Sequence, residues 1–284
     1  MVTENIDGVE VEHWNPFVPR FSGRIGARLP FGGRRNNFGD LLGPVIVRGL
    51  LERARAAGVT TSPGAGPRPR LVAVGSILHF AQAGDTVWGS GVNGKVAADR
   101  HVVDGLDVRA VRGPKTAAFL ESRGLRPPGV FGDPGLLAPL VFPQLPELAR
   151  QPRHALTIVP NLHDHPKWAS HPDAVDPTGD LVGLLERIAQ SERVVGSSLH
   201  GLVIAESLGV PATLIAPETE TLFKYEDYYA GTGRTSFPIA TDLPSALAQA
   251  ADPLDWTSEP LIEAFPIDLW TAGATSAVVP TGRS

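Results

Sequence analysis

Blocks of apolar residues alternate with polar and Gly/Pro-rich blocks along the chain, and this pattern predicts strands followed by helices. Short unbroken apolar runs are typical of parallel strands that are buried on both faces. In the first half, such runs lie at Leu71–Gly75, Asp85–Gly89 and Asp107–Val111, and Val130–Gly135 continues the alternation. Helical spacing predicts helices from Asn37 to about Ala57 and from Pro114 to Arg123.

The second half repeats the alternation of strands and helices. Strands are expected at Ala155–Val159, Arg193–Val195 and Ala212–Ala216, and helices at about Asp180–Gln190, around His200 and at Leu243–Ala250. The proline-rich segment Pro143–Pro152 lies between the halves and is interpreted as an interdomain linker. We therefore predict an α/β protein with two Rossmann-like, doubly wound domains, residues 1–150 and 151–284, that face a cleft.

The two ends of the chain lack a regular period. Residues 1–35 are interpreted as an irregular loop over a site or as a mobile arm, because Gly, Phe and Pro are interleaved with Arg20, Arg24, Arg28, Arg34 and Arg35. The residues after Gly273 are small and polar, so we expect this tail to fray.

Composition narrows the class of protein. Hydrophobic residues make up 42% of the 284 residues, which is enough for a full core, and the net charge of -5 argues against general binding to nucleic acid or anionic membranes. The chain has no cysteine, so disulfides, thiolate metal sites and a cysteine nucleophile are excluded. No apolar run approaches the ~20 residues that span a bilayer, and the polar N-terminus lacks a signal-peptide core. A cytoplasmic protein is the expectation.

The segment from Arg193 to Pro211 carries the strongest chemical signal. A strand end, a Gly-Ser-Ser turn and a short helix follow one another, with Ser198 as a candidate N-cap. His200 then lies in the first helical turn, where free N–H groups and the helix dipole attract an anion. Open α/β sheets bind their ligands at this rim. The alternative is a histidine that only packs in a capping turn.

Arg112 has a comparable position, because it follows a strand and precedes a helix N-terminus. A guanidinium beside free N–H groups suits a carboxylate or a phosphate, whereas the usual position of an arginine is the surface. Lys115, one turn further on, either adds positive charge or is solvated. Asp40 either orients a bound sugar or caps a helix.

Common nucleotide-binding, metal-binding and hydrolase motifs are incomplete or absent in this sequence. Gly89–Val96 resembles a P-loop, but Val96 replaces the hydroxyl that would hold Mg²⁺. His163-Asp-His165, with Asp173 and Asp176 nearby, matches no standard zinc or iron spacing, so a polar loop lining a cleft is favoured over a metal site. The chain has neither a Gly-x-Ser-x-Gly elbow nor a Gly-x-Gly-x-x-Gly turn after the first strand. We expect no metal and no cofactor.

Several segments in order resemble the polysaccharide pyruvyl transferase family. They cover about residues 35 to 235 and are Asn37-Phe-Gly-Asp40, Val74-Gly-Ser-Ile-Leu78, Val87-Trp-Gly-Ser-Gly91, Val111-Arg-Gly-Pro-Lys-Thr116, Gly132-Asp-Pro134, Ile158-Val-Pro160, Ser197-Ser-Leu-His-Gly201, Ser207-Leu-Gly-Val-Pro211 and Phe223-Lys-Tyr-Glu-Asp-Tyr-Tyr229. Each segment alone is a weak signal, and the ordered set is more specific.

The resemblance implies a fold similar to that of GT-B glycosyltransferases. It also implies transfer of pyruvate from phosphoenolpyruvate onto two hydroxyls of a sugar, which gives a cyclic ketal on a cell-surface polysaccharide or its precursor. The acceptor would be a sugar or a lipid-linked oligosaccharide. The family's functional arginine and histidine correspond to Arg112 and His200.

The remaining candidate residues are expected to bind substrate. They are Asn37, Asp40, Ser76, Lys115, Asn161, His163, His165, Ser198 and Lys224. Many family members have arginine where this chain has Ser198 and histidine where it has Asn161, and His163 or His165 could substitute.

Three hypotheses follow: a pyruvyl transferase, a GT-B glycosyltransferase that uses a sugar nucleotide, and a non-catalytic sugar-binding relative. The ordered motifs disfavour the second, and the two departures keep the third open.

Overall fold

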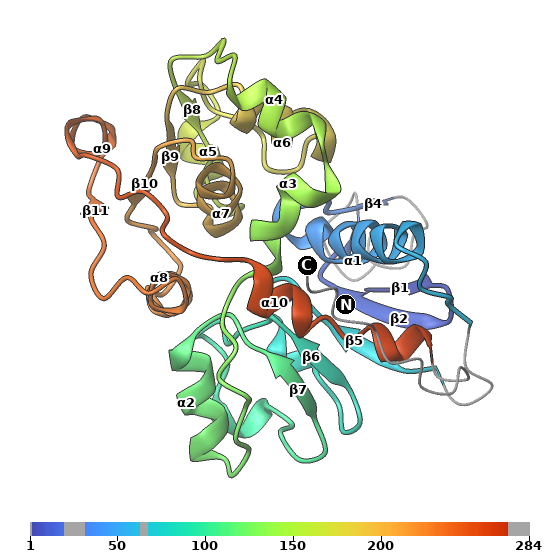
Figure 1. The fold of residues 1–284 in the computed structure, drawn as a ribbon. Coiled ribbons are helices and arrows are strands. Elements are labelled where there is room, and N and C mark those ends of the chain that lie inside the picture. Colours follow the sequence, from blue (N-terminus) through green and yellow to red (C-terminus); the bar gives the residue numbers. More distant parts are fainter. Residues whose placement is uncertain (1, 20–31, 63–67, 272–284) are drawn as a thin grey trace.

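The computed structural model describes residues 2–19, 32–62 and 68–271, and it contains two larger sheets with helices packed on them and a small two-stranded sheet (Figure 1). The first sheet has the strand order β1-β2-β5-β6-β7. Only β1 runs antiparallel to its neighbour, and the other pairs are parallel. The strands are β1 (Val2–Ile6), β2 (Val9–His13), β5 (Arg70–Val72), β6 (Thr86–Trp88) and β7 (Asp107–Ala110).

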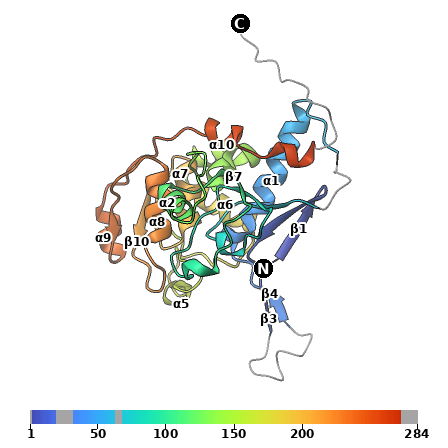
Figure 2. The same cartoon turned by 90° about the horizontal axis from the view of Figure 1, so that it is seen from below.

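The hairpin of β1 and β2 corrects the prediction that residues 1–35 are irregular. Its two-residue turn is Asp7-Gly8, with φ of 48° and 94°, and Asp-Gly is a preferred pair for such turns. The apolar positions Val9 and Val11 alternate with glutamates and face the core. A short ribbon of β3 (Phe17–Pro19) and β4 (Gly32–Arg34) follows and projects from the body (Figure 2). Residues 20–31, with Arg20, Arg24 and Arg28, lie outside the described residues.

The strands predicted near residues 71, 86 and 107 and the two helices predicted in the first half are confirmed to within a few residues, whereas Val130–Gly135 contributes only an isolated bridge between Phe131 and Val111. Helix α1 (Phe38–Ala56) packs its apolar face, including Leu42, Ile46 and Leu50, on the first sheet. Helix α2 (Pro114–Ser122) starts at the predicted proline. Three short 3-10 turns, η2 (Leu78–Phe80), η3 (Ala98–Arg100) and η4 (Pro134–Leu137), complete this half. No helix starts in the P-loop-like segment.

The second sheet is entirely parallel, with the strand order β11-β10-β9-β8. Its strands are β8 (Thr157–Ile158), β9 (Val194–Gly196), β10 (Ala212–Ile215) and β11 (Ile239–Ala240). Its helices are α5 (His165–Trp168), α6 (Leu181–Ala189), α7 (Leu199–Ser207), α8 (Phe223–Gly231) and α9 (Leu243–Ala248). Two sets of parallel strands connected by helices confirm the predicted α/β class.

The proline-rich segment between the halves is not an extended linker. Helix α4 (Gln144–Ala149) occupies it, just after α3 (Ala138–Val141), and Leu145 is completely buried. Pro139 lies in the first turn of α3 and Pro146 in the first turn of α4, where a missing N–H breaks no hydrogen bond. Helix α4 packs on α6, so this segment joins the two halves by contact as well as by sequence.

The last described elements return to the first sheet. They are α10 (Glu259–Glu263) and η5 (Ile267–Trp270), drawn in red in Figure 1. The indole of Trp88 donates to the carbonyl of Leu261, and the indole of Trp270 donates to the carbonyl of Ile6, each at 2.9 Å. The tail after Gly273 lies outside the described residues.

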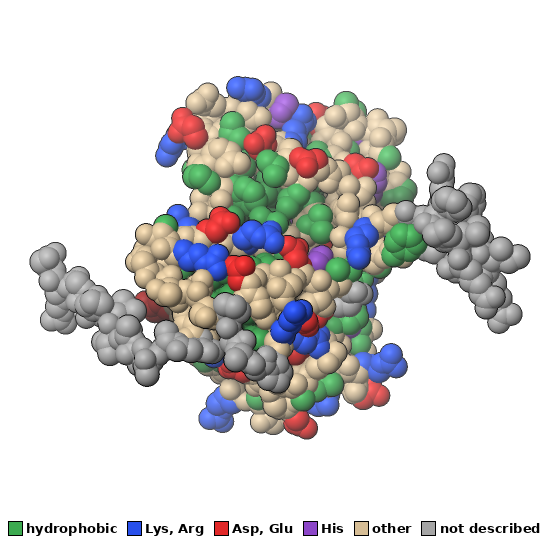
Figure 3. All heavy atoms as spheres, turned by 90° about the vertical axis from the view of Figure 1, so that its right-hand side faces the viewer, with side chains coloured by type: hydrophobic (Ala, Val, Ile, Leu, Met, Phe, Trp, Pro, Cys, Tyr) green, Lys and Arg blue, Asp and Glu red, His purple; other side chains and the backbone are tan. Residues whose placement is uncertain are grey.

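One hydrophobic cluster connects the two halves. It runs from the first sheet through α1 to α6 and α7, and α7 also packs on η4. On the face drawn in Figure 3, Lys and Arg side chains lie among Asp and Glu side chains, so this face carries no broad field of one sign. Among the described residues, no helix is both long and apolar enough to cross a bilayer.

Candidate active site

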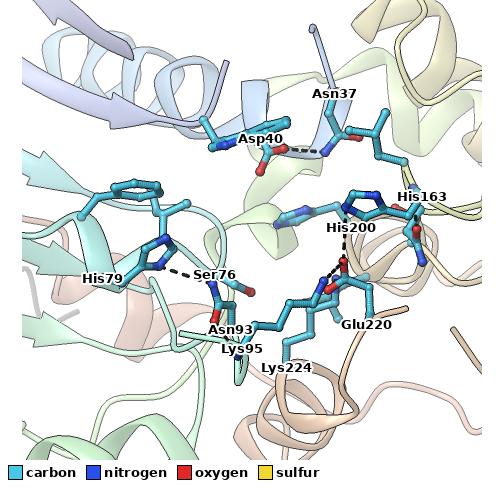
Figure 4. A pocket seen from close by; sticks show the side chains of 17 residues that line it. Asn37, Asp40, Ser76, His79, Asn93, Lys95, His163, His200, Glu220 and Lys224 are labelled. Carbon is cyan, nitrogen blue, oxygen red and sulfur yellow. Dashed lines mark hydrogen bonds and ion pairs between the residues drawn. The ribbon is translucent and has the colours of Figure 1, made fainter. Parts of the chain in front are cut away.

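A pocket of about 240 Å³ lies where the carboxyl ends of the two sheets approach each other (Figure 4). Its residues follow β2, β5 and β6 of the first sheet and β8, β9 and β10 of the second, and the N-terminus of α1 closes it. Parallel α/β sheets usually bind ligands at this edge. The lining residues are Trp14, Asn37, Asp40, Ser76, Ile77, His79, Phe80, Asn93, Lys95, Asn161, Leu162, His163, Ser198, Leu199, His200, Glu220 and Lys224.

Eight of the predicted site residues line this pocket. They are Asn37, Asp40, Ser76, Asn161, His163, Ser198, His200 and Lys224. Arg112, Lys115 and His165 do not line it. Lys115 forms a surface ion pair with Glu226, and His165 lies 3.9 Å from Asp176.

Arg112 is completely buried behind the pocket wall instead of being open to it. Its guanidinium pairs with the equally buried Asp227 of α8 at 2.9 Å and donates to the carbonyl of Val92. The remaining nitrogen donates to the hydroxyl of Ser76 at 2.6 Å, and Ser76 lines the pocket. Arg112 therefore joins the two halves and reaches the pocket through Ser76.

The cap predicted for the helix of His200 is present. The hydroxyl of Ser198 accepts a hydrogen bond from the N–H of Gly201, so α7 begins at Leu199. His200 is the second residue of α7 and is 8% exposed. Its Nδ1 edge lies against Gly39 in the first turn of α1, where a β carbon would come under 3.0 Å from the ring. The imidazole is thus held between two helix N-termini.

Two lysines and a glutamate form a charged cluster at one side of the pocket. Glu220 accepts from Lys95 of the first half at 2.6 Å and from Lys224 of α8 at 3.1 Å. His163 lies 3.9 Å from the same carboxylate (Figure 4). Burial lowers the pKa of Lys224, and Glu220 offsets part of that effect. The two lysine ammonium groups share the carboxylate of Glu220 as their partner. An anionic ligand can take the place of that carboxylate.

Asp40 lines the opposite side, at the start of α1. Its carboxylate accepts from the amide of Asn37 at 2.6 Å. Burial raises the pKa of Asp40, although Asn37 and the charges of His200 and Lys224 act in the other direction. A carboxyl group with a raised pKa beside a histidine is suited to moving protons.

Asn161 lines the pocket, but its amide is occupied by its own loop. The Oδ1 atom accepts from the N–H groups of His163 and Asp164, and the NH₂ group donates to Asp164 and Ser197. These bonds fix the turn that places His163 at the pocket. In this arrangement Asn161 shapes the wall and has little hydrogen-bonding capacity left for a ligand.

Nine of the lining residues are not among the candidates from the sequence. They are Trp14, Ile77, His79, Phe80, Asn93, Lys95, Leu162, Leu199 and Glu220. Burial and the nearby His101 lower the pKa of His79 to about 4, so this ring is neutral at pH 7. The rule that ligands gather after strand ends could have identified His79, Asn93 and Lys95, since they follow β5 and β6. Glu220 and Trp14 carried no local signal.

The pocket is chemically divided. Lys95, Lys224, His163 and His200 give it donors for an anion, and α7 directs its N-terminus at the same space. The side opposite the lysine cluster has aromatic and neutral polar side chains together with the carboxyl group of Asp40, whose pKa is raised by burial. Within residues 2–19, 32–62 and 68–271, no group of three His, Asp or Glu side chains is arranged to hold a metal ion.

Comparison with known proteins gives the following similarities. The family model described as polysaccharide pyruvyl transferase matches residues 37–219. The succinoglycan biosynthesis protein ExoV of Rhizobium meliloti is 30% identical over 186 residues, which are 61% of this chain and 56% of that protein. The uncharacterized protein L143 of Acanthamoeba polyphaga mimivirus is 27% identical over 179 residues, which are 58% of this chain and 61% of that protein. The matches therefore span little more than half the length of these relatives.

Among solved structures, a functionally uncharacterized protein from Klebsiella pneumoniae has 13% sequence identity and a TM-score of 0.47. The alignment covers 72% of this chain and 89% of that one.

Proposed function

Because the chain belongs to the polysaccharide pyruvyl transferase family, we propose that it transfers pyruvate from phosphoenolpyruvate onto two hydroxyls of a sugar, forming a ketal. The acceptor is a cell-surface polysaccharide or its lipid-linked precursor. The observation that carries the proposal is a pocket with lysines on one side and aromatic and polar groups, including Asp40, on the opposite side. A doubly anionic donor fits the first, and an uncharged sugar fits the second.

The reaction consists of two additions at one carbon. Protonation of the donor's methylene carbon gives a methyl group and an oxocarbenium-like centre, which the oxygen of the first hydroxyl attacks. The second hydroxyl then forms its bond to the same carbon as the bond to phosphate breaks. Each hydroxyl releases one proton, and phosphate leaves with the electron pair. The site must therefore supply a proton, remove two and stabilise the leaving phosphate.

We assign these tasks to residues that line the pocket. His200 is the candidate proton donor or phosphate ligand, and Asp40 is the candidate partner in proton movement. Lys95 and Lys224 bind the donor's anionic groups in place of Glu220. Arg112 acts through Ser76 in the present arrangement.

We also propose a GT-B-like fold and a cytoplasmic location for the protein. The two sheets correspond to the two Rossmann-like halves of a GT-B-like fold, 1–150 and 151–284, except that residues 259–270 pack on the first sheet. A phosphoenolpyruvate-dependent enzyme works in the cytoplasm, where that donor is made.

Ligand-dependent melting tests the donor. Phosphoenolpyruvate should raise the Tm, and the increase should disappear in Lys224→Met, because that variant removes a cation from the anionic subsite. A UDP-sugar should have no comparable effect. Stabilisation by UDP-sugars alone would support the glycosyltransferase alternative, and phosphoenolpyruvate binding without phosphate release from a panel of methyl hexosides would support a non-catalytic relative.

We predict that His200→Ala lowers turnover by at least ~10²-fold, the usual contribution of a positioned proton donor. His200→Asn should be nearly as poor if the imidazole transfers a proton, and much better if it only donates a hydrogen bond to phosphate. Phosphate release from phosphoenolpyruvate with a sugar acceptor measures both.

The matched control is His171→Ala, which removes a histidine that does not line the pocket and should leave turnover unchanged. Full activity of His200→Ala would remove His200 from the site.

A further inference from the structure

Asp133 is a buried carboxylate behind the pocket, and it has one oxygen without a hydrogen-bond partner. It lies just before η4, and its Oδ1 accepts from the N–H of Gly135 at 2.9 Å, which caps that turn. Its Oδ2 is fully buried and has no hydrogen-bond partner in the structure. A buried carboxylate oxygen left in that state is costly, so a donor is expected within reach.

The nearest charged partner is the imidazole of His200. The distance from its Nε2 to Oδ2 of Asp133 is 3.6 Å, and this Nε2 is also buried and unpaired. Two unpaired buried atoms of complementary type therefore face each other slightly beyond hydrogen-bond length. Catalytic hydrogen bonds are often long before substrate binds and shorten in the complex.

Three elements hold the ring in this orientation. Helix α7 carries His200, η4 carries Asp133, and both pack against each other and against α1. Gly39 of α1 leaves no room for a side chain beside Nδ1, and a β carbon at Gly135 would be in ordinary contact with Cδ2 of the ring. The ring edge opposite Asp133 therefore faces the first turn of α1, whose Asn37 and Asp40 line the pocket.

We propose that Asp133 is the positioning residue of His200: it accepts the Nε2–H group, so that Nδ1 is the ring nitrogen available to the substrate and donates to it when the ring is protonated. This rests on the proposed role of His200 in transfer. Asp133 touches no substrate atom itself. The carboxylate selects the tautomer and fixes the direction of the ring, as carboxylates that accept from other functional histidines do.

The charge state of Asp133 is consistent with this role. Burial opposes its ionisation, but the nearby imidazole of His200 and the N–H of Gly135 together lower its pKa. The other charged groups near the pair are Asp40 of α1, Lys224 of α8 and Arg112 after β7. Asp133 is therefore an anion at neutral pH.

The test is Asp133→Asn, which is close to isosteric. Its carbonyl can still accept from Gly135, while its NH₂ group replaces the acceptor that faced Nε2. The proton of the neutral ring should then move from Nε2 to Nδ1. We expect turnover to fall by about 10²-fold or more, because a histidine in the wrong tautomer cannot transfer the proton. The KM for phosphoenolpyruvate should change by less than about 3-fold.

Nitrogen-15 NMR of the histidine rings measures which ring nitrogen carries the proton in the ligand-free protein. The signal of His200 is assigned as the one that is lost in His200→Gln. The wild type should carry the proton on Nε2. The control Asp180→Asn alters another helix cap, with an equivalent bond to Gly183 at 2.7 Å, and should change neither tautomer nor turnover.

A wild-type ring protonated on Nδ1, or an unchanged tautomer in a folded Asp133→Asn, would overturn the proposal. Because this readout needs no donor, it separates failure of the inference from failure of the proposed reaction. A variant that does not fold still leaves the wild-type tautomer as a decisive measurement.

Discussion

At the scale of single residues, the pocket contains ionisable side chains whose burial favours the neutral form over the charged form. Asp40 is the clearest case, because burial raises its pKa while Asn37 and the nearby cations offset only part of the shift. The folded state then binds a proton on Asp40 more tightly than the unfolded state does. The stability that this preference contributes is present at low pH and is lost as the pH rises through the folded pKa.

We therefore predict that Asp40→Asn is more stable than the wild type at pH 7 and loses that advantage as the pH falls towards 3.8, the ordinary aspartate value. The gain should be roughly 2–4 °C in Tm, the shift that about 1 kcal/mol produces in a chain of this size. Turnover should fall at least ~10-fold.

Melting curves at a series of pH values, with Asp104→Asn as the exposed control, measure the effect. Equal stability of Asp40→Asn and wild type at every pH would show that ionised Asp40 carries no penalty in the fold.

The sequence predicts residues well where the determinant is local. Ser198 caps α7 as its place before a short apolar helix indicates, and the donor it satisfies is only three residues away. Arg112 is different. Its position after a strand suggested an open anion site, but Asp227 lies 115 residues later and holds the guanidinium inside the protein. A pairing at that distance in sequence leaves no local pattern.

At the scale of elements, α1 positions the site through its glycines. Glycine in a helix normally costs about 1 kcal/mol relative to alanine. Gly39 faces the imidazole of His200, where a β carbon would come under 3.0 Å from Nδ1. Gly43, one turn later, would place its β carbon 3.7 Å from Val74, which is an ordinary contact.

We predict opposite outcomes for the two substitutions. Gly43→Ala should stabilise the protein by about 0.5–1 kcal/mol through helix propensity and leave turnover unchanged. Gly39→Ala should gain no stability and should lose at least ~10-fold in turnover, because the ring of His200 must move. Urea unfolding and phosphate release provide the two measurements. If Gly39→Ala behaved like Gly43→Ala, the contact between α1 and His200 would not matter.

Apolar periodicity predicts the long helices more reliably than it predicts the short strands and turns. The helices at 38–56, 114–122 and 181–189 were expected from apolar spacing, because their buried faces repeat every three or four residues. The β1–β2 hairpin is harder to predict although Asp7-Gly8 is a strong turn signal, because β1, Val-Thr-Glu-Asn-Ile, is largely polar. The helix in the proline-rich segment is not predicted from its composition, because proline marks loops and is also compatible with a first helical turn.

At the scale of the whole molecule, α10 and η5 return to the first sheet and cover it. Trp270 is completely buried, and its indole holds the carbonyl of Ile6, 264 residues earlier. Asp268 pairs with Arg109 at the end of β7, and Trp88 reaches Leu261. The two halves are therefore joined by a segment that belongs to the second half in sequence and to the first sheet in space.

We predict that Trp270→Ala lowers the free energy of unfolding by about 3–5 kcal/mol, the usual effect of removing a buried aromatic ring. Amide hydrogen exchange should become faster in β1 and β2, because the hairpin loses its cover and a hydrogen bond. Leu247→Ala on α9 is the control, since that side chain is 44% exposed and should cost little. Faster exchange confined to residues near 270 would show that the hairpin is stable without this contact.

The return of the chain to its first sheet also sets an order of events during synthesis. Trp88 leaves the ribosome 173 residues before Leu261, its hydrogen-bond acceptor. At about 5–20 residues per second, that interval is roughly 10 to 30 s. During this time the apolar face that α10 and η5 will cover is open, while the second sheet is already being made. The first sheet, whose strands are synthesised first, is thus covered only once α10 and η5 have emerged, and its exposure to chaperones and to other nascent chains is greatest before then.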